Sequence, residues 1–284
     1  MSYISYRPEN GKIRKHPGTM ITRRNSRNYL KENMVLPQNI SAICEEAFFQ
    51  RSSIRSVVFP DSMNFIGASA FEKCQRLQKI YLPGKIRSIG SESFSECTQL
   101  QHVKMPVSAE RMGNNMFAFD SRLSSVEFPK NCTIQTIGPK AFQECGSLSE
   151  IFLPDSITEI NSMAFYRCKK LKNIYFPSGL KSIGSQAFYF CALENLELPD
   201  SLEYLDESAF FKCCQLTYVR LPESVKYIGK WVFHGCSRLK VLEIRHDPEY
   251  IGPWIINRAA AIRCYRGSKV DRYCQGNGFT TEYL

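Results

Sequence analysis

A chain of 284 residues, 43% of them hydrophobic, is long enough for one or two folded domains. It contains no run near the roughly 20 apolar residues of a membrane-spanning helix, and its N-terminus lacks the apolar core of about 7–15 residues that a secretory signal requires. The formal net charge of +10 is concentrated at the front, because residues 1–33 hold eight basic and two acidic side chains, a balance of +6.

Residues 1–33 are predicted to form a basic N-terminal arm or cap. The clusters Lys12–His16 and Arg23–Arg27 carry the charge that neutralises phosphates, which raises the alternative of a nucleic-acid partner. No nucleic-acid-binding motif accompanies them. Residues 245–284 balance at +2, so the repeats between carry only the remaining +2. Nucleic acid is therefore the less favoured partner.

Residues 34–244 are predicted to form nine repeats of about 23 residues. Each unit opens with a proline and continues through an apolar run, usually ending in Ile-Gly, to an Ala-Phe pair, a cysteine and Leu-x-x-Ile-x-Leu. A period of this length predicts a solenoid, in which each coil buries its apolar side chains against its neighbours. The opening prolines are Pro37, Pro60, Pro83, Pro106, Pro129, Pro154, Pro177, Pro199 and Pro222, so one interval is 25 residues, one is 22 and the others are 23.

Each coil is predicted to have three sides. The alternation in 77–82 indicates a half-buried strand, which the following proline ends. A second short extended run ends at a glycine, expected to adopt a backbone turn closed to other residues, with Asn161 and Asp206 as tolerant substitutes. The third side, Ala-Phe-x-x-Cys, has the spacing of a helical or 3-10 turn, in which phenylalanine fills the coil. The glycines are Gly67, Gly90, Gly113, Gly138, Gly184 and Gly229.

Cysteines recur at one repeat position, which predicts a ladder of buried thiols rather than disulfides or a metal site. Arg51 and Asp120 replace the cysteine in two units, so the array does not depend on pairing, and this favours a reducing compartment. No Cys-x-x-Cys pair of the zinc-binding kind occurs. Cys264 and Cys274 are the best candidates for a disulfide, and their redox state stays open. The ladder cysteines are Cys74, Cys97, Cys145, Cys168, Cys191, Cys213 and Cys236.

After Ile244 the pattern degrades, and residues 245–284 are predicted to be a degenerate repeat and C-terminal cap. The expected fold class is a repeat solenoid, predominantly β with short helical or 3-10 turns.

The repeat resembles the BspA-like (treponemal type) leucine-rich repeats. The unit Leu-Pro-x-Ser-Ile/Leu-x-x-Ile-Gly-x-x-Ala-Phe-x-x-Cys-x-x-Leu is nearly intact in residues 153–171 and 221–239, and residues 264–273 resemble the terminal unit of such arrays. The resemblance implies a right-handed leucine-rich-repeat superhelix that binds proteins or surfaces through a variable face. It implies no chemistry.

Nothing in the sequence indicates an enzyme, a cofactor or a small-molecule substrate. The four histidines fall at different places in the repeat pattern, and no phosphate loop, dinucleotide fingerprint or nucleophile elbow occurs. No catalytic, cofactor-binding or metal-ligating residue is therefore predicted.

The candidate partner-binding surface lies on the strands, where the outward positions vary freely. Mixed aromatic and charged side chains are typical of protein interfaces, although aromatics that merely stack between coils are an alternative interpretation. A second candidate patch comprises Tyr166, Tyr189 and Phe211, whose rings are either exposed or tucked under a neighbouring loop. The strand candidates are Tyr81, Lys104, Phe152, Tyr175, Tyr218 and Arg220.

The leading hypothesis is a non-catalytic scaffold that binds a protein or a polymer through the strands of the solenoid. A surface or secreted adhesion module is the alternative, and a nucleic-acid binder using the basic arm is less favoured. As the sequence stands we expect a cytoplasmic protein, or a secreted or cell-surface protein if a signal segment was removed.

Overall fold

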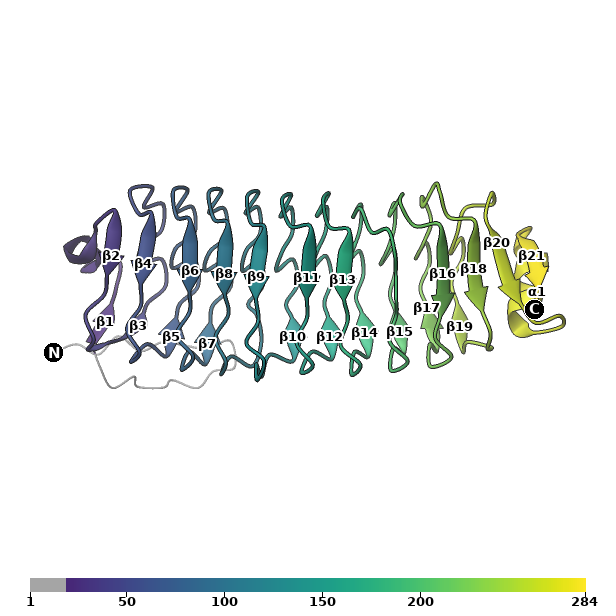
Figure 1. Ribbon diagram of the computed structural model, residues 1–284, viewed down its shortest axis with the longest axis horizontal. Helices are drawn as coiled ribbons and strands as arrows, with labels where there is room; N and C mark the ends of the chain where they lie inside the picture. Colours follow the sequence, from purple (N-terminus) through teal and green to yellow (C-terminus); the bar gives the residue numbers. More distant parts are fainter. Residues whose placement is uncertain (1–18) are drawn as a thin grey trace.

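The computed structural model describes residues 19–284, which form a rod of stacked coils (Figure 1). The cluster Lys12–His16 lies outside the described residues. Each regular coil contributes one strand to a first row, a shorter strand to a second row, and a series of turns that returns the chain to the first row. The predicted solenoid is confirmed.

The first row of strands presents one long surface, which we call the strand face. Its neighbours pair in parallel with the register of one repeat, as in Phe152 opposite Tyr175. The row consists of three sheets: a five-stranded sheet of β2 (Asn33–Val35), β4 (Ser56–Val58), β6 (Lys79–Tyr81), β8 (His102–Lys104) and β9 (Ser125–Glu127); a two-stranded sheet of β11 (Glu150–Phe152) and β13 (Asn173–Tyr175); and a four-stranded sheet of β16 (Tyr218–Leu221), β18 (Val241–Ile244), β20 (Ala261–Cys264) and β21 (Thr280–Tyr283).

The breaks in this row occur where the repeat length changes. The 25-residue unit from Pro129 to Pro154 separates β9 from β11. The 22-residue unit from Pro177 to Pro199 contains residues 195–198, which form no strand. In that short unit a Cys-x-Leu spacing at 191–193 replaces the usual Cys-x-x-Leu, so the turn before the strand lacks one residue. A changed turn length displaces the next segment from the hydrogen-bonding register.

The second row lies beside the first and continues through the short unit. Its first sheet contains β1 (Thr19–Ile21), β3 (Ile40–Ile43), β5 (Phe65–Ile66) and β7 (Ser88–Ile89). Its second sheet contains β10 (Thr136–Ile137), β12 (Glu159–Ile160), β14 (Ser182–Ile183), β15 (Tyr204–Leu205), β17 (Tyr227–Ile228) and β19 (Tyr250–Ile251). The coils around the short unit, which are not paired on the strand face, are therefore still paired through their second-row strands β14, β15 and β17.

A ladder of phenylalanine rings runs through the core, as the repeat predicts. Each ring is fully buried and stacks on the next, with centroids between 5.1 Å (Phe48 to Phe71) and 5.8 Å (Phe94 to Phe117) apart. Burial of apolar area and ring stacking thus act together in every layer. The ladder comprises Phe48, Phe71, Phe94, Phe117, Phe142, Phe165, Phe188, Phe210 and Phe233.

The glycines of the Ile-Gly position serve a different purpose from the predicted one. None of the six has a positive φ, so the prediction that they adopt a backbone turn closed to other residues is wrong. A Cβ at Gly90 would instead lie 2.3 Å from the backbone nitrogen of Ala68, and one at Gly67 would lie 2.4 Å from that of Glu45. Glycine is favoured at these positions because the backbones of successive coils approach each other closely there.

The third side differs in local conformation from the predicted helical or 3-10 turn. Lys140 and Glu144 have φ values of 57° and 58°, in the left-handed region, and the same two positions recur along the rod. The amide of Phe142 donates to Ala164 O of the next coil at 2.8 Å, whereas the amide of Gln143 donates to Lys140 O within its own turn at 3.1 Å. Alternate amides therefore join the coils, which a 3-10 turn would prevent because it uses its amides internally.

The seven ladder cysteines are buried, as predicted, and none forms a disulfide. Each thiol donates to the carbonyl oxygen of a ladder phenylalanine in the preceding coil, as from Cys168 Sγ to Phe142 O at 3.1 Å. Burial raises the pKa of Cys74 and of Cys236 to about 12, and it raises that of the other ladder thiols as well. These groups are neutral packing elements at physiological pH.

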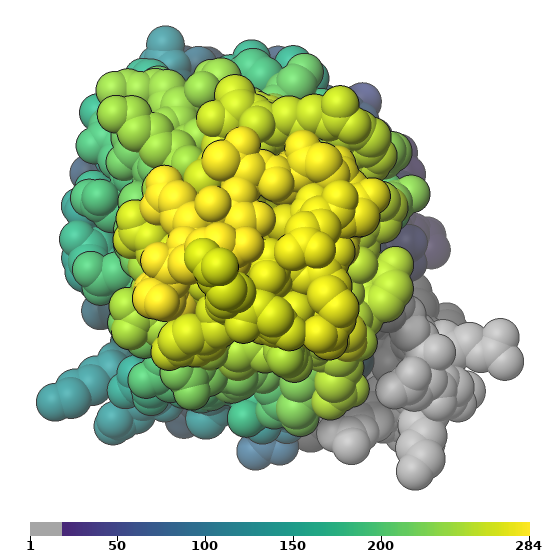
Figure 2. All heavy atoms as spheres, turned by 90° about the vertical axis from the view of Figure 1, so that its right-hand side faces the viewer, coloured from purple at the N-terminus to yellow at the C-terminus, as the bar shows by residue number. Residues whose placement is uncertain are grey.

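Both ends of the rod are covered. At the N-terminal end β1 and β2 flank the 3-10 helix Ser26–Tyr29, labelled η1. At the C-terminal end β20, helix α1 (Lys269–Asn277) and β21 close the last coil (Figure 2). Ser268 caps α1 by accepting from the Asp271 amide, and the helix buries its own residues Val270 and Cys274. Cys264 and Cys274 are both free thiols.

Candidate interaction surface

The strand face exposes the side chains that flank a buried central residue in each short strand. In β11 and β13 the pattern is exposed, buried, exposed, because Cβ atoms alternate across a strand. All six predicted strand candidates point outward, with Tyr81 at 54% and Phe152 at 58% exposure. They fall on three different sheets of the strand face.

Phe152 and Tyr175 form the most compact aromatic feature of this face. Their rings are 4.1 Å apart and inclined by only 3°. The rings stack between coils, as the alternative interpretation of the aromatics proposed, and both remain about half exposed. Stacking therefore fixes the two side chains without removing them from solvent.

Tyr218 and Arg220 belong to an ion cluster that the sequence did not reveal. Glu243 stands at an outward position of the strand pattern, but only 2% of it is exposed. It accepts from Tyr218 Oη at 2.9 Å, Arg245 Nε at 2.6 Å and Arg263 Nη1 at 3.1 Å. Burial acts to raise the pKa of Glu243, but these hydrogen bonds outweigh it and leave the pKa below its ordinary value. The hydroxyl group of Tyr218 is therefore already used in a hydrogen bond within the protein.

The second candidate patch is a half-buried stack. Tyr166 and Tyr189 lie 4.8 Å apart, and Tyr189 and Phe211 lie 5.1 Å apart. The column continues to His234, 5.8 Å from Phe211. Stacking covers the ring faces that lie between successive coils, so the column does not form an open apolar patch.

The second row of strands carries a line of tyrosines that the sequence analysis did not predict. Tyr204, Tyr227 and Tyr250 occupy the same register position in β15, β17 and β19. The rings of Tyr227 and Tyr250 stack at 4.7 Å. The signal was present, since all three residues stand immediately before the last apolar residue of the Ile-Gly run.

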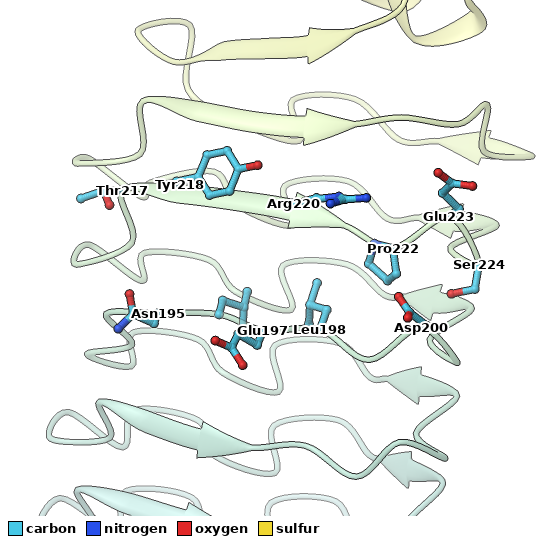
Figure 3. Close-up of a pocket in the computed structure, with 11 residues that line it drawn as sticks. Asn195, Glu197, Leu198, Asp200, Thr217, Tyr218, Arg220, Pro222, Glu223 and Ser224 are labelled. Atoms are coloured by element: carbon cyan, nitrogen blue, oxygen red, sulfur yellow. The ribbon is translucent and has the colours of Figure 1, made fainter. Parts of the chain in front are cut away.

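A groove opens in the strand face between residues 195–200 and 217–224 (Figure 3). Its volume is about 820 Å³, and Leu196, Leu198 and Pro222 supply its apolar surface. Leu198 is partly exposed, as are Phe128 and Phe176, which precede the proline in other units. The groove therefore has some apolar surface that solvent can reach.

Within residues 19–284 no cluster of three or more histidine, cysteine or acidic side chains could hold a metal ion. The histidines there are separate: His102 lies on β8, His234 follows the core phenylalanine Phe233 on the turn side, and His246 bonds Val225 O. The same part of the chain contains no helix of the length and apolarity needed to cross a bilayer.

The geometry defines the class of protein: a solenoid of leucine-rich repeats with an exposed strand face. Residues 25–136 and 135–262 match the family described as BspA type leucine rich repeat region (6 copies). The chain belongs to this family of leucine-rich repeat proteins.

Solved structures with similar chains are also leucine-rich repeat proteins. One from Bacteroides ovatus is 19% identical, with 96% of this chain and 94% of that chain covered and a TM-score of 0.47. The T. pallidum leucine-rich repeat protein is 26% identical, with coverages of 84% and 87% and a TM-score of 0.47. A leucine-rich cell surface protein from Faecalibacterium prausnitzii is 21% identical, with coverages of 89% and 92% and a TM-score of 0.42. No curated protein matches the chain.

Proposed function

We propose that this protein is a non-catalytic interaction scaffold that binds a protein or polymeric partner through its strand face, centred on Phe152 and Tyr175. The observation that carries the proposal is their stacked and exposed geometry. Large aromatic side chains already held in one rotamer lose little conformational entropy on binding and contribute most where they become desolvated.

The charges around the pair support a macromolecular partner. Lys79 and Lys104 lie toward the N-terminal end of the face, and Glu127 and Glu150 lie next to the pair. An extended surface with aromatic residues inside a charged rim has the layout of a protein interface. Tyr81, Lys104, Tyr218 and Arg220 form the outer part of the proposed surface.

The test compares partner capture by three forms of the full chain. Phe152→Ala plus Tyr175→Ala is expected to lose captured partners, because truncating a true anchor weakens binding by about 2 kcal/mol or more. Tyr204→Ala plus Tyr250→Ala is the matched control, since it removes two exposed rings from the second side of the rod. Circular dichroism verifies that each variant folds.

Retention of every partner by the Phe152/Tyr175 variant would place the binding surface elsewhere. The stack of Tyr166, Tyr189 and Phe211 is then the next candidate, to be tested in the same way.

The unpaired ladder thiols support a reducing compartment for this scaffold, because cysteines in oxidising compartments are commonly consumed in disulfides. Fractionation of cells that express the tagged full-length reading frame tests this. Recovery at the cell surface or in the medium would favour the adhesion alternative instead.

A further inference from the structure

The groove on the strand face combines three features. It lies where two coils separate, it contains backbone groups without partners, and its walls carry excess negative charge. The inference below rests on the proposed function, because both use the strand face.

The first feature is the unpaired backbone. In regular units the strand pairs with both neighbours, as β6 pairs with β4 and with β8. Residues 195–198 have no backbone hydrogen bond to either side in the described part of the chain. Strand β16 pairs with β18 alone, so its edge toward the groove is also free. Two facing rows of free donors and acceptors form a template for another strand.

The second feature is the size of the opening. The two walls remain joined below the groove, because β15 pairs with β17 and Phe210 N donates to Val232 O at 2.9 Å. Only the strand face opens, to a volume of about 820 Å³. Residues 195–198 extend over roughly 13 Å at 3.3 Å per residue, enough to align about four residues of an extended guest.

The third feature is charge. Glu197, Asp200 and Glu223 line the groove against a single cation, Arg220, which leaves a balance of −2. None of the three carboxylates forms an ion pair within residues 19–284, whereas Arg220 lies 3.8 Å from Glu243. The exposed part of Leu198 offers an apolar contact between these charges.

We propose that this groove binds an extended polypeptide segment with alternating basic and apolar residues, which adds as a strand between residues 195–198 and β16. Main-chain hydrogen bonds supply affinity in this mode, and alternate side chains supply specificity. The lysine or arginine side chains of the guest face Glu197, Asp200 and Glu223, and its apolar residues contact Leu198 and Pro222.

The probe is a fluorescein-labelled hexapeptide of alternating valine and lysine, titrated against the full chain by fluorescence anisotropy. We expect saturable binding that slows hydrogen exchange of the amides at residues 195–198 and 218–221. The same peptide with N-methylated backbone amides should bind at least about tenfold more weakly, since it cannot donate to the groove edges. A valine–glutamate hexapeptide should not bind.

Two charge-reversal variants localise the effect. Glu197→Lys plus Asp200→Lys is expected to weaken the lysine peptide at least about tenfold. Asp61→Lys plus Asp155→Lys applies the same charge change to two other coils and should leave the affinity unchanged.

Any one of three results overturns the inference: no binding to the wild-type chain, equal binding of the N-methylated peptide, or binding without protection at residues 195–198. The Phe152/Tyr175 variant leaves the groove intact and separates the two proposals. If partner capture needs those rings but the peptide does not bind, only the proposal for the groove is refuted. If the peptide binds but partner capture does not need the rings, only the proposal for the Phe152 and Tyr175 surface is refuted.

Discussion

Asp120 shows how a single residue can depart from the repeat at an energetic cost. It occupies the position of a ladder cysteine and is fully buried. Its Oδ1 accepts from the Cys97 amide at 2.7 Å, but Oδ2 has no partner in the described part of the chain. Burial therefore raises the pKa of Asp120 well above its ordinary value. The carboxyl group is most easily accommodated in its neutral form.

This raised pKa predicts a specific pH dependence for Asp120→Asn. A carboxyl whose pKa is higher in the folded state contributes most to stability below its unfolded pKa, and that contribution is lost as pH rises toward the folded pKa. The variant should therefore gain stability relative to the wild type as pH rises above the ordinary pKa of an aspartate, about 4, toward the raised pKa of the folded state.

Urea unfolding at several pH values measures this difference. Asp155→Asn serves as the exposed control and should track the wild type. A stability difference for Asp120→Asn that is the same at pH 4 and pH 7 would show that the carboxyl does not titrate abnormally.

At the scale of the strand, the second row depends on close backbone approach. Successive coils contact each other at the glycines that follow β5 and β7, where Gly90 lies against Ala68. Their separation is set by main-chain hydrogen bonds such as Gly90 N to Ile66 O at 2.8 Å. A side chain here must displace a strand rather than a flexible neighbour.

Gly90→Ala should consequently destabilise the protein by about 1–3 kcal/mol, the range for overpacking a tight site. Gly276→Ala is the matched control, because Gly276 lies in α1 with nothing within 4 Å of an added Cβ. That change should instead stabilise the helix by about 0.5–1 kcal/mol. Equal denaturant midpoints for the two variants would refute the explanation of the glycines by close approach.

At the scale of the whole molecule, each layer buries its phenylalanine and cysteine only when its neighbours are present. A solenoid of this kind is stabilised by the sum of coil and interface contributions, with the ends most exposed to local opening. The ladder thiols are distributed along nearly the whole rod, from Cys74 to Cys236, and report on opening at each layer.

We expect native thiol labelling to leave the seven ladder cysteines unmodified, and denaturant to release all of them. Cys214 is partly exposed and provides an internal positive control. Mass spectrometry of digested protein locates the label. Rapid native labelling of Cys145 or Cys168 would contradict their inaccessibility.

The period, the coil boundaries and the buried Phe and Cys ladders could be predicted from the sequence alone, because each is a local pattern repeated many times. The exposure of Phe152 and Tyr175 also followed from strand alternation. Three features needed the tertiary structure: the reason for glycine at position 90, the burial of Glu243 and the groove beside residues 195–198. Each depends on the distance between coils about 20 residues apart in sequence, which is set by how successive backbones stack and shifts when one turn loses a residue.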